Sequence, residues 1–144
     1  MYYIGLDIGT SALKTTLMDA RRSIVYENSY GYTILQPQEG WREIDPDVWM
    51  QAVMKGLHDI ARCNPQEVSV IGVTGQMHTT VFLDKNGEAV RNAIMWTDLR
   101  TAGMVEELRT ECSQREETRH IAEILSPGSP AVNTLWIKEH EPQS

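Results

Sequence analysis

The first 32 residues contain three short apolar runs with only a few residues between them, and this spacing constrains the fold more than any other feature. The runs are Tyr2–Asp7, Leu13–Met18 and Ile24–Tyr32, and the connections are Gly9-Thr10-Ser11 and Arg21-Arg22. Strands joined by such short turns must be antiparallel, because a parallel pair needs a crossover of roughly a dozen residues or more. The sequence therefore predicts an antiparallel three-stranded sheet at the start of the chain.

A loop and a long helix are predicted next. Thr33–Glu43 contains a proline and a glycine and has no regular apolar period, which is typical of a loop. Asp45-Pro46 is typical of a helix start, because Asp caps unpaired N–H groups and Pro lacks an N–H that would be unpaired there. Apolar residues then recur at helical spacing. Because Pro65 disfavours helical geometry at the preceding residue, the helix should end near Cys63-Asn64.

The rest of the chain alternates strands and helices. Val68–Thr74 is rich in valine and isoleucine and is predicted as a buried strand, and Thr79–Leu83 is predicted as a further strand. Asp84-Lys85-Asn86-Gly87 follows as a hairpin turn, in which Asn-Gly supplies the residues with positive φ. Helices are predicted over Thr101–Leu108, Thr118–Leu125 and Ala131–His140. A mixed sheet covered by helices places the chain in the α/β class.

Composition and charge exclude several classes of protein. The chain has 144 residues, 41% of them hydrophobic, and a formal net charge of −7, so one acidic globular domain is expected. Nucleic acid is excluded as the main partner, because phosphate backbones are held by clustered Lys and Arg. Cys63 and Cys112 lack a metal-ligand spacing and indicate free thiols in a reducing compartment. Without a signal peptide or an apolar stretch that could cross a bilayer, the chain is predicted to be cytoplasmic and not membrane-bound.

Asp7-Ile8-Gly9-Thr10-Ser11, at the end of the first strand, is the first candidate site. Gly9 allows positive φ or close approach to a ligand, and exposed N–H groups in such a turn can hold an anion. Lys14 adds a cation, and Asp7 suits a hydrated Mg²⁺, which prefers one or two carboxylates together with substrate phosphates. The alternative is an ordinary β-turn, since these residue types all favour turns, and the local pattern favours that alternative slightly.

Gly75-Gln76-Met77-His78 is the second candidate site, at the end of a predicted strand, where α/β proteins bind ligands. Gln76 and His78 can hydrogen-bond hydroxyl groups, and Met77 can pack against the apolar face of a sugar. The alternative is a structural corner in which Met77 is a core residue and His78 a surface residue. The spacing alone favours this alternative.

Met95-Trp96-Thr97-Asp98-Leu99-Arg100 is the third candidate site. Trp96 can stack on a sugar ring, while Asp98 and Arg100 can bond hydroxyl groups or each other. The alternative is a core tryptophan beside a weak surface ion pair. The local pattern does not decide between the two.

Together these segments resemble the FGGY family of carbohydrate kinases. Tyr3–Leu17 resembles the phosphate-binding hairpin that opens these kinases, within the wider group of actin, hexokinase and the heat-shock chaperone ATPases. Gly72–Arg100 resembles the pattern of xylulokinases, in which GQMH is followed by a hairpin, an Asn-Ala-Ile strand and a Trp-x-Asp-x-Arg corner. Gly40–Val53 and Leu135–Pro142 match as well, so that the resemblance covers essentially the whole chain.

The resemblance implies a ribonuclease H-like fold, of which residues 1–144 form an incomplete N-terminal domain without the C-terminal domain. It implies transfer of the γ-phosphoryl group of ATP, with Mg²⁺, to a sugar hydroxyl, for xylulokinases the 5-hydroxyl of D-xylulose. By the same resemblance, ATP is bound by Asp7, Gly9, Thr10, Ser11 and Lys14, with Asp7 on the metal. The sugar is bound by Gln76, Met77, His78, Trp96, Asp98 and Arg100.

The resemblance also implies that the catalytic base, an aspartate, lies beyond Ser144, so the chain alone is predicted to be inactive. Thr79 stands where xylulokinases have Gly or Ala, and Ile124–Trp136 departs from their small-residue and Lys-Leu pattern. Gluconate, L-ribulose and glycerol therefore remain alternative substrates. A non-catalytic nucleotide- or sugar-binding domain of the same fold is the competing class. Apolar surface left uncovered by the missing part favours self-association as a homodimer.

Overall fold

The computed structural model describes residues 1–63 and 65–143 and contains two compact units. The first unit comprises Met1–Thr33 and Pro46–Gln76. The second comprises Ile34–Asp45 and Met77–Ser144. The units are therefore interleaved along the chain, because a segment of the second lies between the two segments of the first.

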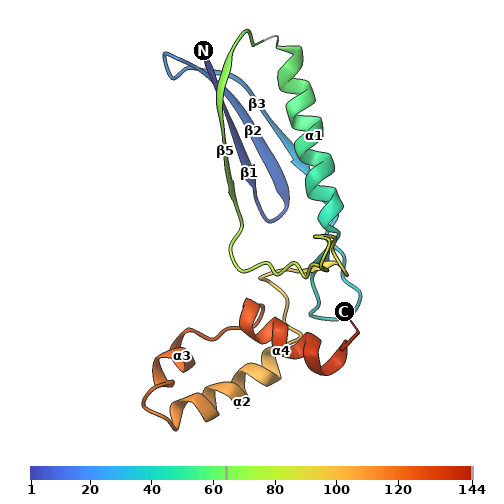
Figure 1. Cartoon of the computed structure of the whole chain (residues 1–144), viewed down its shortest axis with the longest axis vertical. Coiled ribbons are helices and arrows are strands. Elements are labelled where there is room, and N and C mark those ends of the chain that lie inside the picture. The colour runs from blue at the N-terminus through green and yellow to red at the C-terminus, as the bar shows by residue number, and fades with distance from the viewer. Residues whose placement is uncertain (64, 144) are drawn as a thin grey trace. The chain divides into compact units, whose positions relative to one another are not determined.

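A four-stranded sheet forms most of the first unit (Figure 1). Its strands are β1 (Tyr2–Ile8), β2 (Ala12–Asp19), β3 (Ile24–Gly31) and β5 (Val68–Gly75), in the order β3-β2-β1-β5. The first three are antiparallel neighbours, which confirms the prediction from the short turns, and β5 lies parallel to β1.

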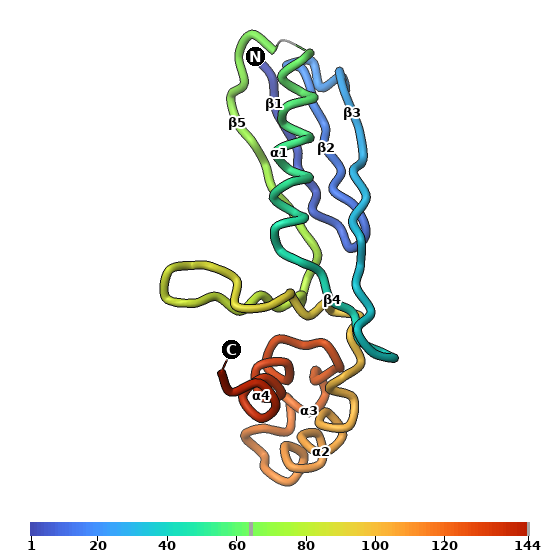
Figure 2. The backbone as a smooth tube through the Cα atoms, turned by 90° about the vertical axis from the view of Figure 1, so that its right-hand side faces the viewer, coloured from blue at the N-terminus to red at the C-terminus, as the bar shows by residue number. Residues whose placement is uncertain are grey.

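Helix α1 (Pro46–Arg62) covers one face of this sheet (Figure 2). Leu13 and Leu17 of β2 are almost completely buried there, and Ile60 of α1 is buried with them. The helix begins at Pro46, as predicted. It ends at Arg62, one residue before the predicted end at Cys63, and Asn64 lies outside the described residues.

Strand β5 was predicted to be buried, and this prediction is wrong for the described chain. All eight residues of β5 are exposed, and Ile71 and Val73 are 46% and 64% exposed. The reason is that β5 is an edge strand, and its apolar side chains on both faces have no covering element among the described residues. Apolar residues on both faces are typical of parallel strands that are covered on both sides.

In the second unit, two short strands, β4 (Glu43–Ile44) and β6 (Ala93–Ile94), pair in an antiparallel manner. The predicted loop over residues 33–43 therefore ends in a strand. The predicted strand Thr79–Leu83 is not formed; Thr80 and Leu83 make isolated bridges to Ile94 and Ala89. The register changes between these two bridges, so no continuous ladder develops.

The hairpin turn at residues 84–87 is present, but only Gly87 has positive φ, at 84°. The prediction that Asn86 also does so is wrong. The Asp84 carboxylate instead accepts the N–H groups of Asn86 and Glu88, at 2.7 and 3.0 Å, and thereby holds the turn. These backbone hydrogen bonds lower the pKa of the Asp84 carboxyl group.

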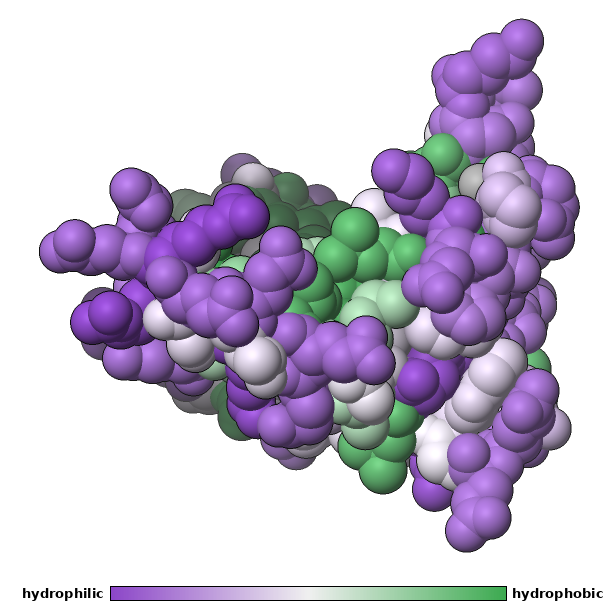
Figure 3. Space-filling model, turned by 90° about the horizontal axis from the view of Figure 1, so that it is seen from below, coloured by the Kyte–Doolittle hydropathy of each residue, from purple (hydrophilic) through white to green (hydrophobic). Residues whose placement is uncertain are grey.

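Three helices, α2 (Ala102–Ser113), α3 (Arg119–Ile124) and α4 (Pro130–His140), complete the second unit. Their shared core contains Val105, Leu125 and Val132. Helix α2 extends beyond the predicted Leu108 to Ser113, and Cys112 in this last turn packs against the shared core. Seen from below, the molecular surface is mainly hydrophilic, with apolar residues exposed among the charged ones (Figure 3). No helix among residues 1–63 and 65–143 is both long and apolar enough to cross a membrane.

Candidate functional site

Three polar side chains lie side by side across the sheet of the first unit. Asp7 of β1 is the register partner of Lys14 on β2 and of Thr74 on β5. Since side chains alternate along a strand, this row lies on the face opposite the buried Leu6 and Leu13. A hollow of about 400 Å³ on this face is lined by Gly5, Leu6, Asp7, Lys14, Thr16, Gly72, Val73 and Thr74. Thr74 was not among the predicted site residues, although its place at the end of a strand was a usable signal.

Gly9 closes the hairpin between β1 and β2. Its N–H donates to the carbonyl of Ala12 at 3.0 Å, so this N–H is not available to an anion. A Cβ at Gly9 would lie 3.0 Å from the same oxygen, and its φ is not positive. Of the two alternatives for Gly9, positive φ is not adopted, and the close approach that Gly9 makes is to its own hairpin. The carbonyl of Ser11 accepts the N–H of Tyr32 at 2.9 Å, which ties the hairpin to the end of β3.

Lys14 forms an ion pair with Glu27, with 3.1 Å between its Nζ and the carboxylate. Both side chains are about half exposed, so the pair contributes little to stability. An anion in the hollow could therefore attract the Lys14 ammonium group at small cost.

Asp7 is exposed at the rim of the hollow. Within the described part of the chain, no three His, Cys, Asp or Glu side chains lie close enough together to hold a metal ion. A single exposed carboxylate nevertheless fits Mg²⁺, which is usually bound by one or two carboxylates and the phosphates of a nucleotide.

Tyr32 also belongs to this region, and no sequence motif pointed to it. Its hydroxyl group is buried and has no hydrogen-bond partner among the described residues. Burial and, to a smaller extent, the negative charge of Asp7 together raise the pKa of Tyr32 to about 12. The charge on Asp7 therefore acts on the Tyr32 hydroxyl group.

This shift predicts a loss of stability in alkaline solution. An unfolded tyrosine ionises near pH 10, whereas folded Tyr32 stays neutral up to about pH 12, so the free energy of unfolding should fall as pH rises between these values. Burial also raises the pKa of Tyr30, which adds to the effect. Urea denaturation at pH 9, 10 and 11 would measure the slope, and Tyr32→Phe should make it shallower. An equal slope in the variant would contradict the prediction.

Gln76, the last residue of the first unit, contains an unusual buried amide. Both its Nε2 and its Oε1 are buried without a hydrogen-bond partner among the described residues, while its backbone N–H donates to Ile8 at 3.0 Å. Buried polar groups almost always have partners, and leaving one unpaired costs about 1–3 kcal/mol. The Gln76 amide therefore lacks, among the described residues, the partners that a buried amide usually has.

In the second unit, Met77 and His78 form a strained turn. The N–H of Thr79 donates to the carbonyl of Met77 at 2.8 Å, and His78 between them has a φ of +61°. Three-residue turns with positive φ are rare, and such strain is concentrated at functional sites. Met77 is 74% exposed, so the alternative that it is a core residue is wrong.

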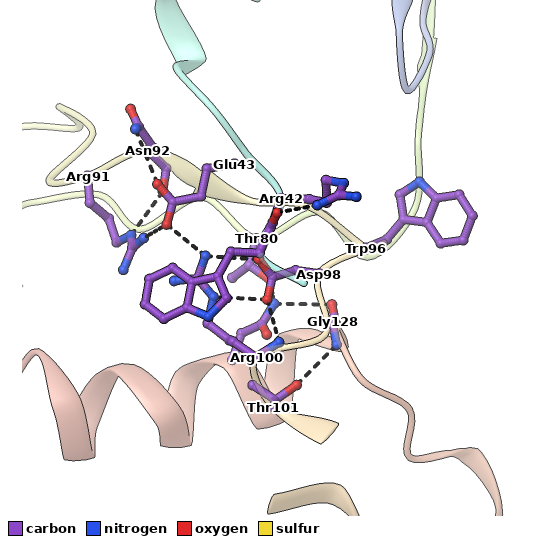
Figure 4. Close-up of polar contacts among 12 residues, drawn as sticks. Arg42, Glu43, Thr80, Arg91, Asn92, Trp96, Asp98, Arg100, Thr101 and Gly128 are labelled. Atoms are coloured by element: carbon purple, nitrogen blue, oxygen red, sulfur yellow. Dashed lines mark hydrogen bonds and ion pairs between the residues drawn. The ribbon is translucent and has the colours of Figure 1, made fainter. Parts of the chain in front are cut away.

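Trp96 is 48% exposed, so the alternative of a core tryptophan is also wrong. Its backbone N–H donates to the hydroxyl of Thr79 at 3.3 Å, which links this corner to the turn at His78. Its indole points away from the charged cluster formed by Glu43, Asp98 and Arg100 (Figure 4).

Asp98 and Arg100 are buried, in contrast to Trp96. The side chains of Asp98 and Arg100 are 0% and 1% exposed, so they are not the weak surface ion pair of the alternative prediction. Asp98 accepts the backbone N–H groups of Arg42 and Arg100 at 2.6 and 2.8 Å, as well as the Arg100 guanidinium at 2.9 Å. The structure therefore pairs Asp98 and Arg100 with each other. Their predicted contact with a sugar would require this corner to open.

Glu43 completes the cluster and was not predicted as a site residue. It accepts a hydrogen bond from Arg100 Nη2 at 2.7 Å and also pairs with Arg91. The Arg100 guanidinium lies 3.8 Å from the ring centre of Trp41. Burial opposes the charge of Arg100, but hydrogen bonds to Asp98 and Glu43 outweigh it and raise the pKa of this guanidinium. The cluster thus binds the backbone of the corner that carries Trp96, through the hydrogen bonds that Asp98 accepts from the Arg42 and Arg100 N–H groups.

These features can be compared with known proteins. A family model described as the N-terminal domain of the FGGY family of carbohydrate kinases matches residues 2–144. The chain belongs to this family. Its members are phosphotransferases that act on carbohydrates, as the resemblance in the sequence implied.

A xylulose kinase of Staphylococcus xylosus is 33% identical over 141 residues, which is 97% of this chain and 29% of the relative. Crystal structures of a ligand-bound xylulose kinase and a gluconate kinase, both from Lactobacillus acidophilus, superpose with TM-scores of 0.84 and 0.85. Each is 26% identical and matches 99% of this chain and 29% of its own. The predicted α/β, ribonuclease H-like fold is confirmed. The chain spans about 29% of the length of these relatives.

Proposed function

We propose that this chain is the N-terminal part of an ATP-dependent kinase that phosphorylates D-xylulose on its 5-hydroxyl group. Membership of the FGGY family and the 33% identity to a xylulose kinase support this proposal. The structural observation that carries it is the exposed, strained turn at His78, hydrogen-bonded through Thr79 to the exposed Trp96. An aromatic face beside hydrogen-bonding groups is suited to a sugar, which presents apolar C–H faces and a rim of hydroxyl groups.

In this proposal, the hairpin of the first unit binds the phosphates. Asp7 would hold the magnesium ion, which would supply charge neutralisation to the phosphates, and Lys14 would exchange Glu27 for a phosphate oxygen. Thr10 and Ser11 offer hydroxyl groups at the turn, whereas Gly9 serves to close the hairpin.

The sugar is held by Gln76, Met77, His78 and Trp96. The unpaired amide of Gln76 gains its missing partners from hydroxyl groups, and Trp96 supplies the stacking surface. Asp98 and Arg100 do not contact the sugar in this proposal; they hold the backbone that carries Trp96. Binding energy is thereby used to position the acceptor hydroxyl, which is the main contribution of proteins to phosphoryl transfer.

During transfer, the bond between the γ-phosphorus and the bridging oxygen of ATP breaks and a bond from the sugar oxygen to that phosphorus forms. The hydroxyl proton must pass to a base. Asp7 is unsuited to this role, since a carboxylate on a metal ion is not free to accept a proton. We propose that the base is an aspartate in a part of the protein beyond Ser144, and that this chain alone does not catalyse.

Gluconate is the second candidate substrate. The chain is as similar in fold to a gluconate kinase as to a xylulose kinase, with the same sequence identity to both. A non-catalytic binding domain is the remaining alternative. We further propose a cytoplasmic location, and self-association of the isolated chain through the exposed strand β5.

The test is ATP-dependent phosphorylation of a panel of ketoses, polyols and sugar acids, by this chain and by a longer protein that contains it. We expect turnover of D-xylulose by the longer protein only, and a KM for the sugar raised about tenfold or more in Trp96→Ala and His78→Ala. Met50→Ala is the matched control, because Met50 is an exposed side chain on α1, at 61% exposure.

If the longer protein prefers another sugar, D-xylulose is the wrong substrate, but the proposed phosphorylation reaction stands. Binding of sugar or nucleotide without turnover of any panel member would favour the non-catalytic alternative. Turnover by this chain alone would show that the base lies within residues 1–144.

A further inference from the structure

Asn133, in the first turns of α4, connects two segments that are distant in the sequence. Its side chain is fully buried. The Nδ2 amide donates to the hydroxyl of Thr80 at 2.9 Å and to the carbonyl of Gly128 at 3.1 Å. Both hydrogens of one NH₂ group are thus used as a bridge between the segment after His78 and the loop before α4.

On the first side of this bridge, the hydrogen bonds continue to the strained turn. The Thr80 hydroxyl accepts from Asn133 and donates its own hydrogen to the carbonyl of His78, at 3.3 Å. A residue with φ of +61° persists only where its surroundings hold it there. Asn133 therefore supports the conformation of His78 through a chain of two hydrogen bonds.

On the second side, the bridge reaches the backbone of Trp96. Gly128 has a φ of +75°, and a Cβ placed on it would lie 2.5 Å from the carbonyl oxygen of Trp96. The N–H of Gly128 donates to the buried hydroxyl of Thr101 at 3.2 Å (Figure 4). The position of Gly128 consequently limits where the Trp96 backbone can lie.

We propose that Asn133 is a positioning residue for the sugar site, which sets the spacing between His78 and Trp96 and so contributes to the choice of sugar. Asn133 touches no ligand itself, because its side chain has no exposed surface. This inference rests on the proposed function, since His78 and Trp96 are the groups that the sugar would contact. Asn133 lies outside the three sequence motifs that pointed to the candidate site.

The first experiment needs no catalysis. In ¹H–¹⁵N NMR spectra of this chain, Asn133→Ala and Thr80→Val should both shift the amide resonance of His78, while Asn133→Ala alone should also shift that of Trp96. Thr80→Ser retains the hydroxyl group and should restore the His78 resonance. Thr134→Ala is the matched control: Thr134 neighbours Asn133 on α4, but its hydroxyl donates to the Pro130 carbonyl within the same helix. An unshifted His78 in both Asn133→Ala and Thr80→Val would overturn the proposal.

The second experiment uses a longer, active protein that contains this chain. Asn133→Ala and Thr80→Val should each raise the KM for the sugar about tenfold and change its preference among sugars, with the KM for ATP and kcat within about twofold. Their double variant should be little worse than either single one, because both break the same connection. If the KM for the sugar and the KM for ATP rose equally, or if only the stability fell, Asn133 would be a structural residue and not a positioning residue.

The two experiments separate the two proposals. If the longer protein phosphorylates no sugar, the proposed function fails, while the NMR shifts still decide whether Asn133 controls His78 and Trp96. If phosphorylation is found but the KM for sugar is unchanged in both variants, the positioning role fails and the kinase function stands.

Discussion

Replacement of Arg100 by methionine should reduce the free energy of unfolding of the second unit by about 3–5 kcal/mol, the usual cost of removing one partner from a buried ion pair. The guanidinium is 1% exposed and bonds both Asp98 and Glu43, so its removal would leave Asp98 as a buried carboxylate without a neutralising charge and Glu43 with Arg91 as its cation among the described residues. Methionine fills much of the same volume, so the loss of charge dominates over the loss of packing. Urea denaturation followed by tryptophan fluorescence would measure the change.

Arg115→Met is the matched control, because Arg115 is 68% exposed and pairs with the exposed Glu111 on the surface. Its effect should stay within about 1 kcal/mol. Arg100→Lys should fall between the two, since an ammonium group keeps the charge but cannot make the forked hydrogen bonds of a guanidinium. If Arg100→Met were no more destabilising than Arg115→Met, the cluster would not support the Trp96 corner.

Gly128→Ala should destabilise the second unit by about 2–5 kcal/mol, from two causes that act together. Positive φ costs a non-glycine residue about 1–3 kcal/mol, and overpacking typically costs about as much again. The new methyl group would lie 2.5 Å from the Trp96 carbonyl oxygen, so either the loop or the Trp96 backbone must move. Denaturation would report the stability, and the emission spectrum would report a changed environment of Trp96.

Gly87→Ala separates the two causes. Gly87 also has positive φ, at 84°, but no atom lies within 4 Å of the position of its Cβ. This variant should therefore lose only the backbone contribution. A similar loss in both variants would mean that Gly128 does not press against Trp96.

Local sequence patterns predicted the first unit well. Apolar runs and short turns fix β1, β2 and β3, and Asp45-Pro46 fixes the start of α1, because each signal lies within the element it defines. The exposure of β5 could not be predicted in this way. Its Val- and Ile-rich sequence is typical of a strand that is covered on both faces, whereas no element among the described residues covers β5.

The sequence predicted the exposed residues of the candidate site but missed part of its buried hydrogen-bonding network. Met77, His78 and Trp96 were named as site residues, and all three are exposed. The role of Glu43 was missed because its partners Arg91 and Arg100 lie far along the chain, so no local spacing joins them. The link from Asn133 to Thr80 is of the same kind: it exists only once α4 has packed.

The interleaving of the two units also determines how this chain can be dissected. A fragment cut after Gln76 would keep Glu43 on β4 but lose β6, Arg91 and Arg100. The complementary fragment from Met77 would keep the two arginines without their shared carboxylate. Neither half would then hold a complete set of charges, so cleavage at this single peptide bond should damage the second unit even though the cut falls at its boundary. A chimera between two relatives should therefore exchange residues 34–45 and 77–144 together, because these two segments form one unit.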